Sequence, residues 1–182
     1  MHNRKAIITG VTGQDGSYLA DQLVAKGYSV LGLTRDPSVE FKGNVAHLKG
    51  LIDLAHCSYD QQSIAGLIES FDPHEIYNLA GQSFVSRSWE FQQETLESAG
   101  LVPCYFLEAI AKHNPLIRFF QASSSEIFQP APNQEPLTEL SPIQPVNPYG
   151  CAKGLAHNMV AAYRNNKKLF AVNGILFNHE SE

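Results

Sequence analysis

Short apolar runs alternate with helix-like stretches along the whole of this 182-residue sequence. Strands that alternate with helices pair in parallel through right-handed crossovers, which place helices on both faces of the sheet. The pattern therefore predicts an α/β fold of the Rossmann type, with a doubly wound parallel sheet. The expected strands are 6–8, 29–33, 76–77, 117–120 and 170–177, and the expected helices are 18–25, 64–68, 101–111 and 154–163.

The composition is that of one globular domain, which we expect to span 1–182. Hydrophobic residues make up 43% of the chain and charged residues 17%, so a sizeable core can form. The net charge of −5 argues against a nucleic-acid partner, and no apolar run approaches the roughly 20 residues of a membrane helix. Cys57, Cys104 and Cys151 lack metal-ligand spacing, so we predict no metal site and a reduced, cytoplasmic chain.

Three glycines follow the first expected strand with the spacing G-x-x-G-x-x-G. Gly10 allows a tight turn, Gly13 lets the backbone approach a pyrophosphate, and Gly16 lets the next helix lie close to the strand. Phosphates at this point meet free N–H groups at a helix N-terminus. Doubly wound sheets bind ligands beyond the carboxyl ends of their strands, so the motif predicts dinucleotide binding.

The second expected strand ends at Arg35 and Asp36. A carboxylate at this place hydrogen-bonds the ribose 2′-hydroxyl of NAD, whereas an arginine accommodates the 2′-phosphate of NADP. Arg35 comes first, and the sequence therefore favours NADP.

A tyrosine and a lysine, Tyr149 and Lys153, share one face of a helix that begins after Pro148. A phenol is a poor base at neutral pH, and a nearby ammonium group favours its ionised form. The serine-rich segment 123–126 follows another expected strand. Hydroxyl, phenol and ammonium groups are therefore expected to converge on the nicotinamide.

Four segments of the chain resemble the GDP-mannose 4,6-dehydratases, a family of extended short-chain dehydrogenases/reductases. They are 6–19, 77–85, 121–126 and 174–181. The Gln-Asp pair at 14–15 and the Asn-His-Glu-Ser sequence at 178–181 distinguish this family from its relatives. The resemblance covers the whole chain, and the family continues well beyond position 182. It implies that the C-terminal substrate domain is absent.

The resemblance implies an NADP-dependent lyase that converts GDP-mannose to GDP-4-keto-6-deoxymannose. Tyr149 then takes the proton of the 4-hydroxyl group while the cofactor accepts the C4 hydride, which later returns to C6. Glu126 removes the C5 proton and assists loss of the C6 hydroxyl group as water. Ser124 hydrogen-bonds the 4-oxygen, and Lys153 binds the nicotinamide ribose and tunes Tyr149.

Binding roles also follow from the resemblance. It assigns substrate contacts with a GDP-sugar to Ser83 and Asn178, and it implies a homo-oligomer, either a dimer or a tetramer. The cofactor contacts that it adds to the three glycines and Arg35 are Thr12, Gln14, Asp15, Leu79, Ala80, Tyr149 and Lys153.

Two departures from the family stand out. Cys57 occupies the place of an aspartate that contacts adenine, which puts adenine affinity in doubt. Pro103 lies inside an expected helix, which it should kink or break at a cost of about 3 kcal/mol.

Two other functions stay open on the sequence. One is a non-catalytic NADP-binding module or fragment, and the other is an epimerase, reductase or decarboxylase of the same superfamily. Glu126 favours a dehydratase or a decarboxylase over an epimerase, because a tyrosine/lysine pair without a carboxylate supports only oxidation and reduction.

Overall fold

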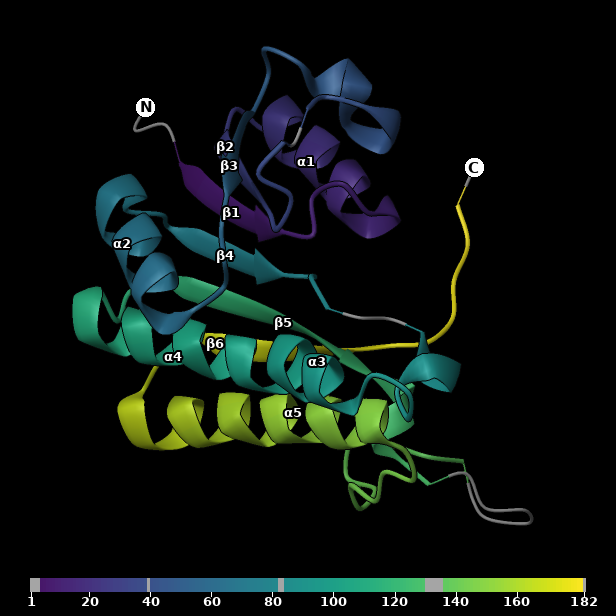
Figure 1. Ribbon diagram of the computed structural model, residues 1–182. Helices are drawn as coiled ribbons and strands as arrows, with labels where there is room; N and C mark the ends of the chain where they lie inside the picture. The colour runs from purple at the N-terminus through teal and green to yellow at the C-terminus, as the bar shows by residue number, and fades with distance from the viewer. Residues whose placement is uncertain (1–3, 39, 82–83, 130–135, 182) are drawn as a thin grey trace.

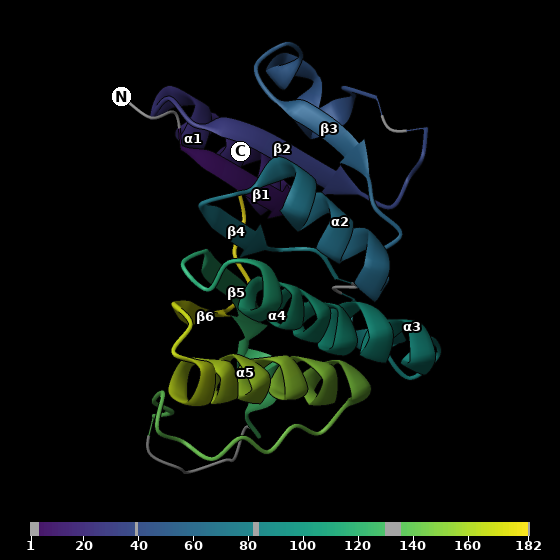
Figure 2. The same cartoon turned by 90° about the vertical axis from the view of Figure 1, so that its left-hand side faces the viewer.

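The computed structural model describes residues 4–38, 40–81, 84–129 and 136–181, which form a six-stranded parallel sheet of order β3-β2-β1-β4-β5-β6 (Figure 2). All its neighbouring strands pair in parallel. The order reverses between β1 and β4, and this reversal opens a crevice at the carboxyl ends of the strands. The predicted Rossmann-type fold class is therefore confirmed. The strands are β1 Lys5–Thr9, β2 Ser29–Thr34, β3 Asp53–His56, β4 Glu75–Asn78, β5 Arg118–Ser124 and β6 Ala171–Leu176.

Helices cover both faces of the sheet, as the alternating pattern predicts (Figures 1 and 2). Ile8 of β1 belongs to the core cluster beneath α1 and η1, whereas Ile7 belongs to the cluster beneath α2, α4 and α5. Neighbouring residues of one strand are both apolar because both faces are buried. The helices are α1 Gln14–Ala25, η1 Gly43–Leu48, α2 Gln61–Phe71, η2 Val85–Arg87, α3 Gln92–Leu96, η3 Glu97–Leu101, α4 Val102–His113, η4 Ser125–Ile127 and α5 Pro148–Lys167.

Strand β3 is the described strand that the sequence pattern does not predict. It is one of the two edge strands of the described sheet and pairs with β2 alone. Asp53 and His56 are exposed and its two central residues are half-buried, so no apolar run marks it. An edge strand has less need of apolar residues than a central parallel strand, which explains the missing signal.

Pro103 does not break its helix. Residues 92–113 form one continuous helical run, in which the turn Glu97–Leu101 is a π-helix and Pro103 lies in the first turn of α4. Proline has no N–H group and leaves a carbonyl of the preceding turn without its usual donor. A π-turn shifts the hydrogen bonds by one residue, and the Val102 amide accordingly donates to the Glu97 carbonyl, five residues back. The expected break is thus absorbed by one wide turn.

The glycine-rich loop lets β1 pass directly into α1. Gly10 has φ +67°, in the left-handed region, and its carbonyl accepts a hydrogen bond from the Gly13 amide at 3.0 Å. A Cβ atom on Gly16 would lie 2.3 Å from the Gly10 oxygen and 2.6 Å from the Val11 Cα. Helix α1 can therefore approach the end of β1 only with glycine at position 16.

We expect Gly16→Ala to lower the free energy of unfolding by about 1–3 kcal/mol, because the backbone must shift to make room for the methyl group. Gly66→Ala is the matched control, since Gly66 lies on α2 and a Cβ there meets nothing within 4 Å. That change should raise the free energy of unfolding by about 0.5–1 kcal/mol. Urea titrations of both variants test this, and equal effects would contradict it.

Candidate functional site

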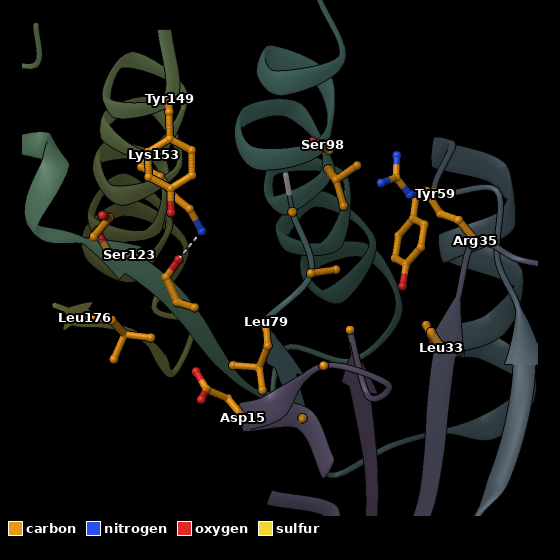
Figure 3. A pocket seen from close by; sticks show the side chains of 18 of the residues that line it. Asp15, Leu33, Arg35, Tyr59, Leu79, Ser98, Ser123, Tyr149, Lys153 and Leu176 are labelled. Carbon is orange, nitrogen blue, oxygen red and sulfur yellow. Dashed lines mark hydrogen bonds between the residues drawn. The ribbon is translucent and has the colours of Figure 1, made fainter. Parts of the chain in front are cut away.

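An open cleft of about 900 Å³ lies at the carboxyl ends of the strands, over the point where the strand order reverses (Figure 3). Every described residue that the sequence analysis assigned to the site lines this cleft. Ser83, the other assigned substrate contact, lies outside the described residues. The lining residues among them are Gly10, Thr12, Gly13, Gln14, Asp15, Gly16, Arg35, Leu79, Ala80, Ser124, Glu126, Tyr149, Lys153 and Asn178.

Helix α5 carries Tyr149 and Lys153 to the cleft on one of its faces (Figure 3). Pro148 opens the helix, and the Asn147 side chain caps it by accepting a hydrogen bond from the Gly150 amide at 2.7 Å. The Lys153 Nζ donates to the Ala122 carbonyl on β5 at 2.7 Å and lies 5.6 Å from the centroid of the Tyr149 ring. Burial lowers the pKa of Lys153 from its ordinary 10.5 to about 8.

The Tyr149 phenol is protonated in this site. Burial raises its pKa above 10, a hydrogen bond with the Ser124 hydroxyl lowers it, and the nearby Glu126 carboxylate raises it. The sequence analysis expected the ammonium group to favour the ionised phenol. The net direction is the opposite, because burial penalises the phenolate more than its polar neighbours stabilise it.

The Glu126 carboxylate is held beside this pair by Asn147. The Asn147 Nδ2 donates to Glu126 Oε2 at 2.8 Å, and the Ser124 Oγ accepts from the Glu126 amide at 3.2 Å. One asparagine therefore caps α5 and orients the carboxylate. The sequence analysis gave Asn147 no role, although an asparagine directly before a proline that opens a helix is an N-cap signal.

A row of buried polar side chains crosses the ends of β1, β4 and β5, and we call it the polar row: Thr9, Asn78 and Gln121. Thr9 Oγ1 donates to Asn78 Oδ1, and Asn78 Nδ2 donates to Gln121 Oε1, each at 2.8 Å. Gln121 Nε2 donates at 2.8 Å to the Ala122 carbonyl, the same oxygen that Lys153 contacts. All three side chains are fully buried.

The polar row also fixes the loop after β4. The amides of Leu79 and Ala80 donate to Thr9 Oγ1 at 3.0 and 2.9 Å. Both residues line the cleft, so their backbone is set by a side chain from the end of β1. The sequence analysis missed this role of Thr9.

Arg35 lies exposed at the far end of the cleft from Lys153 (Figure 3). Its Nη1 lies 3.4 Å from Glu94 Oε1. Asp36 turns its carboxylate to Ser38, whose amide and hydroxyl donate to it at 2.8 and 2.7 Å. Cys57 is buried in the core, and its sulfur accepts from the Tyr59 amide, so the thiol takes no part in lining the cleft.

His179 ties the segment after β6 to the start of α1. Its Nε2 lies 2.9 and 3.0 Å from the two carboxylate oxygens of Asp15, and its Nδ1 lies 2.7 Å from the Phe177 carbonyl. These contacts, the carbonyl first, raise the pKa of His179 above 6.5. The pair places Asn178 on the wall of the cleft beside the glycine-rich loop.

Two features are absent from the described residues. No group of three or more His, Cys, Asp or Glu side chains among them is placed to hold a metal ion. None of the helices that the structure describes is long and apolar enough to cross a membrane.

A parallel sheet of this order, with a glycine-rich loop at its switch point and a Tyr-x-x-x-Lys helix facing it, defines the short-chain dehydrogenase/reductase class. The family model for GDP-mannose 4,6 dehydratase matches residues 7–182, and the chain belongs to that family. The human GDP-mannose 4,6 dehydratase is 40% identical over 187 residues, and that of Vibrio cholerae is 38% identical over 188 residues. The alignments cover 97% and 98% of this chain, which spans about half the length of these curated relatives.

Solved structures share the fold. Pal from Bacillus thuringiensis has a TM-score of 0.83 at 24% identity, over 93% of this chain and 54% of its own. The UDP-glucose 4-epimerase of Thermus thermophilus, solved as a complex with NAD, has a TM-score of 0.79 at 24% identity, over 91% and 52%. Both alignments place the described sheet in the same class of fold.

We expect Lys153→Met to stabilise the chain at neutral pH and to lose that advantage as the pH rises. The folded chain releases the Lys153 proton near pH 8 and the unfolded chain near 10.5, so the unfolded chain binds more protons between these values. The free energy of unfolding of the unmodified chain should therefore rise across this window by roughly 3 kcal/mol relative to the Met variant. Urea titrations of both proteins from pH 7 to pH 10 measure the difference between their free energies of unfolding. The contributions of other titrating groups cancel in this difference. A constant difference would show that Lys153 titrates normally.

Proposed function

We propose that residues 1–182 form the NADP-binding domain of a nucleotide-sugar 4,6-dehydratase, a lyase that acts on GDP-mannose. The observation that carries the proposal is the Glu126 carboxylate, held by Asn147 next to Tyr149 and Ser124 in the cleft. Oxidation and reduction need the phenol and the lysine, whereas elimination of water needs a further base for the C5 proton. The names of the curated relatives support the same reaction.

The cleft has the groups that a dinucleotide cofactor needs. The first amides of α1, behind Gly13, are placed to meet a pyrophosphate, because Gly13 itself carries no side chain. Arg35 takes the 2′-phosphate at one end, and Lys153 takes the nicotinamide ribose at the other. A bound nicotinamide supplies the hydride acceptor and donor of the reaction.

The protein groups divide the proton chemistry between them. Tyr149 must first lose its own proton before it can take that of the 4-hydroxyl group, and the Ser124 hydrogen bond stabilises the phenolate that this step requires. Glu126 then removes the C5 proton, which the 4-keto group has made acidic, and assists loss of the C6 hydroxyl group as water. Asn147 keeps the carboxylate in place, and Asn178 and Ser83 contact the sugar nucleotide.

We also propose that the protein is cytoplasmic and forms a homo-oligomer. Leu96 and Leu155 are 42% and 40% exposed on the neighbouring helices α3 and α5. Apolar side chains on adjoining helix faces are suited to pack against the same face of a second copy.

The cofactor prediction concerns Arg35. NADPH should bind several-fold more tightly than NADH, because a charge-assisted contact with the 2′-phosphate is worth about 1.5–3 kcal/mol. Arg35→Gln should remove most of the difference by weakening NADPH alone. Calorimetric titration of both proteins with both cofactors measures these affinities. Equal affinities for NADPH and NADH in the unmodified chain would contradict the assignment of Arg35 to the 2′-phosphate.

The reaction prediction uses this chain alone and the same chain extended by the C-terminal half of a GDP-mannose 4,6-dehydratase. The 182-residue chain should bind NADP(H) without turnover of GDP-mannose, because an open face neither positions the sugar nor excludes water. In the extended chain, Tyr149→Phe should abolish 4-keto formation and leave cofactor binding nearly intact. Glu126→Gln should permit C4 oxidation and block exchange of the C5 hydrogen with deuterium.

Two conservative variants serve as controls in the extended chain. Tyr105→Phe removes another phenol that lines the cleft, and Glu97→Gln neutralises a carboxylate near its Arg35 end. Both should keep turnover within about twofold. Normal C5 exchange in the Glu126→Gln protein would assign the base to another group. Turnover by the 182-residue chain at about 1 per second or faster would contradict its expected inactivity.

A further inference from the structure

The end of the cleft around Arg35 is crowded with carboxylates. Asp36, Asp60, Glu94 and Glu97 line the cleft together with Arg35. An anion such as a 2′-phosphate therefore enters a region where four carboxylates stand beside the Arg35 guanidinium group. Interactions between charges at such distances are partly screened by water and salt, so the carboxylate nearest to Arg35 matters most.

Two of these carboxylates accept hydrogen bonds from residues two or three positions further along the chain. Asp36 accepts two hydrogen bonds from Ser38. Asp60 caps α2 by accepting from the Ser63 amide at 2.9 Å. Both are held by neighbours in sequence and are not directed at Arg35.

The other two lie three residues apart on the run that contains α3, and they differ in their partners. Glu97 accepts a hydrogen bond from Gln93 Nε2 at 2.9 Å. Glu94 pairs with Arg35 across 59 residues of sequence, at 3.4 Å. The two side chains of that pair are 55% and 49% exposed, so a ligand in the cleft can reach both of them.

We propose that Glu94 is a specificity-determining residue for the coenzyme: it holds Arg35 in the free chain and competes with the 2′-phosphate for the same guanidinium group. The inference rests on the proposed use of Arg35 to bind NADP. The 2′-phosphate must displace the Glu94 carboxylate or bind beside it. A cofactor without this phosphate leaves the pair intact. Glu94 therefore weakens the binding of NADPH and leaves that of NADH unchanged. It thereby reduces the preference for NADPH over NADH that Arg35 creates.

The test compares dissociation constants of NADPH and NADH, measured by calorimetry, for the unmodified chain, four variants at Glu94 and Glu97, and Arg35→Gln. Glu94→Gln should tighten NADPH by about twofold to fivefold, the scale of an exposed ion pair. Glu94→Lys should tighten it further, because a second cation then faces the phosphate. The affinity for NADH should change by less than about twofold in both.

Glu97→Gln and Glu97→Lys are the matched controls, since they make the same charge changes three residues along the same helical run. They should shift the ratio of NADPH to NADH affinity much less than the Glu94 variants do. Equal shifts at the two positions would overturn the proposal, because they would indicate a general effect of net charge. An unchanged ratio in Glu94→Gln would overturn it too.

The result for Arg35 separates this inference from the proposed function. If Arg35→Gln removes the NADPH preference and Glu94→Gln leaves it unaltered, the NADP assignment stands and the role of Glu94 fails. If the unmodified chain shows no preference and Arg35→Gln changes neither affinity, the NADP assignment itself fails.

Discussion

The architecture of the cleft depends on the polar row of Thr9, Asn78 and Gln121. Parallel pairing places Thr9 opposite Asn78 and Asn78 opposite Gln121, so the three side chains stand in register on adjacent strands. A buried polar group without a partner costs about 1–3 kcal/mol, and each side chain of the row is satisfied by the next one. A slip of any of these strands by one residue would leave the row unpaired. The row therefore fixes the register of the sheet at the cleft.

The same row connects backbone geometry to chemistry. At one end it orients the amides of Leu79 and Ala80, and at the other it shares the Ala122 carbonyl with Lys153. Burial around this end has a chemical consequence, because it raises the pKa of Tyr149 and lowers that of Lys153. Both shifts favour the uncharged forms. At neutral pH the phenol is therefore protonated, whereas Lys153, with a pKa of about 8, still carries its charge.

Local patterns are sufficient to predict much of this site. The glycine spacing predicts the tight turn at Gly10 and the close approach at Gly16, because both depend on backbone sterics within seven residues. The spacing of Tyr149 and Lys153 predicts that they share a helix face. The order of strands and helices predicts the doubly wound sheet, since few topologies satisfy right-handed crossovers.

Other features depend on contacts between distant segments and leave no local signal. Arg35 pairs with Glu94, which lies 59 positions away in the sequence, and Asp15 pairs with His179, which lies 164 positions away. The sign of the pKa shift at Tyr149 depends on how deeply α5 packs, which the spacing of Tyr149 and Lys153 does not specify. Strand β3 lacks an apolar run because it lies at the edge.

The wide turn at Glu97–Leu101 has a consequence for helical phase. A residue added to or removed from an α-helix rotates everything beyond it by about 100° around the axis. The π-turn next to Pro103 accommodates such an extra residue, so α3 and α4 keep one axis while their faces are offset. If the turn were regular, Glu94 would be carried about a quarter of the way around the helix, away from Arg35. The π-turn thereby sets which side chain of α3 faces Arg35.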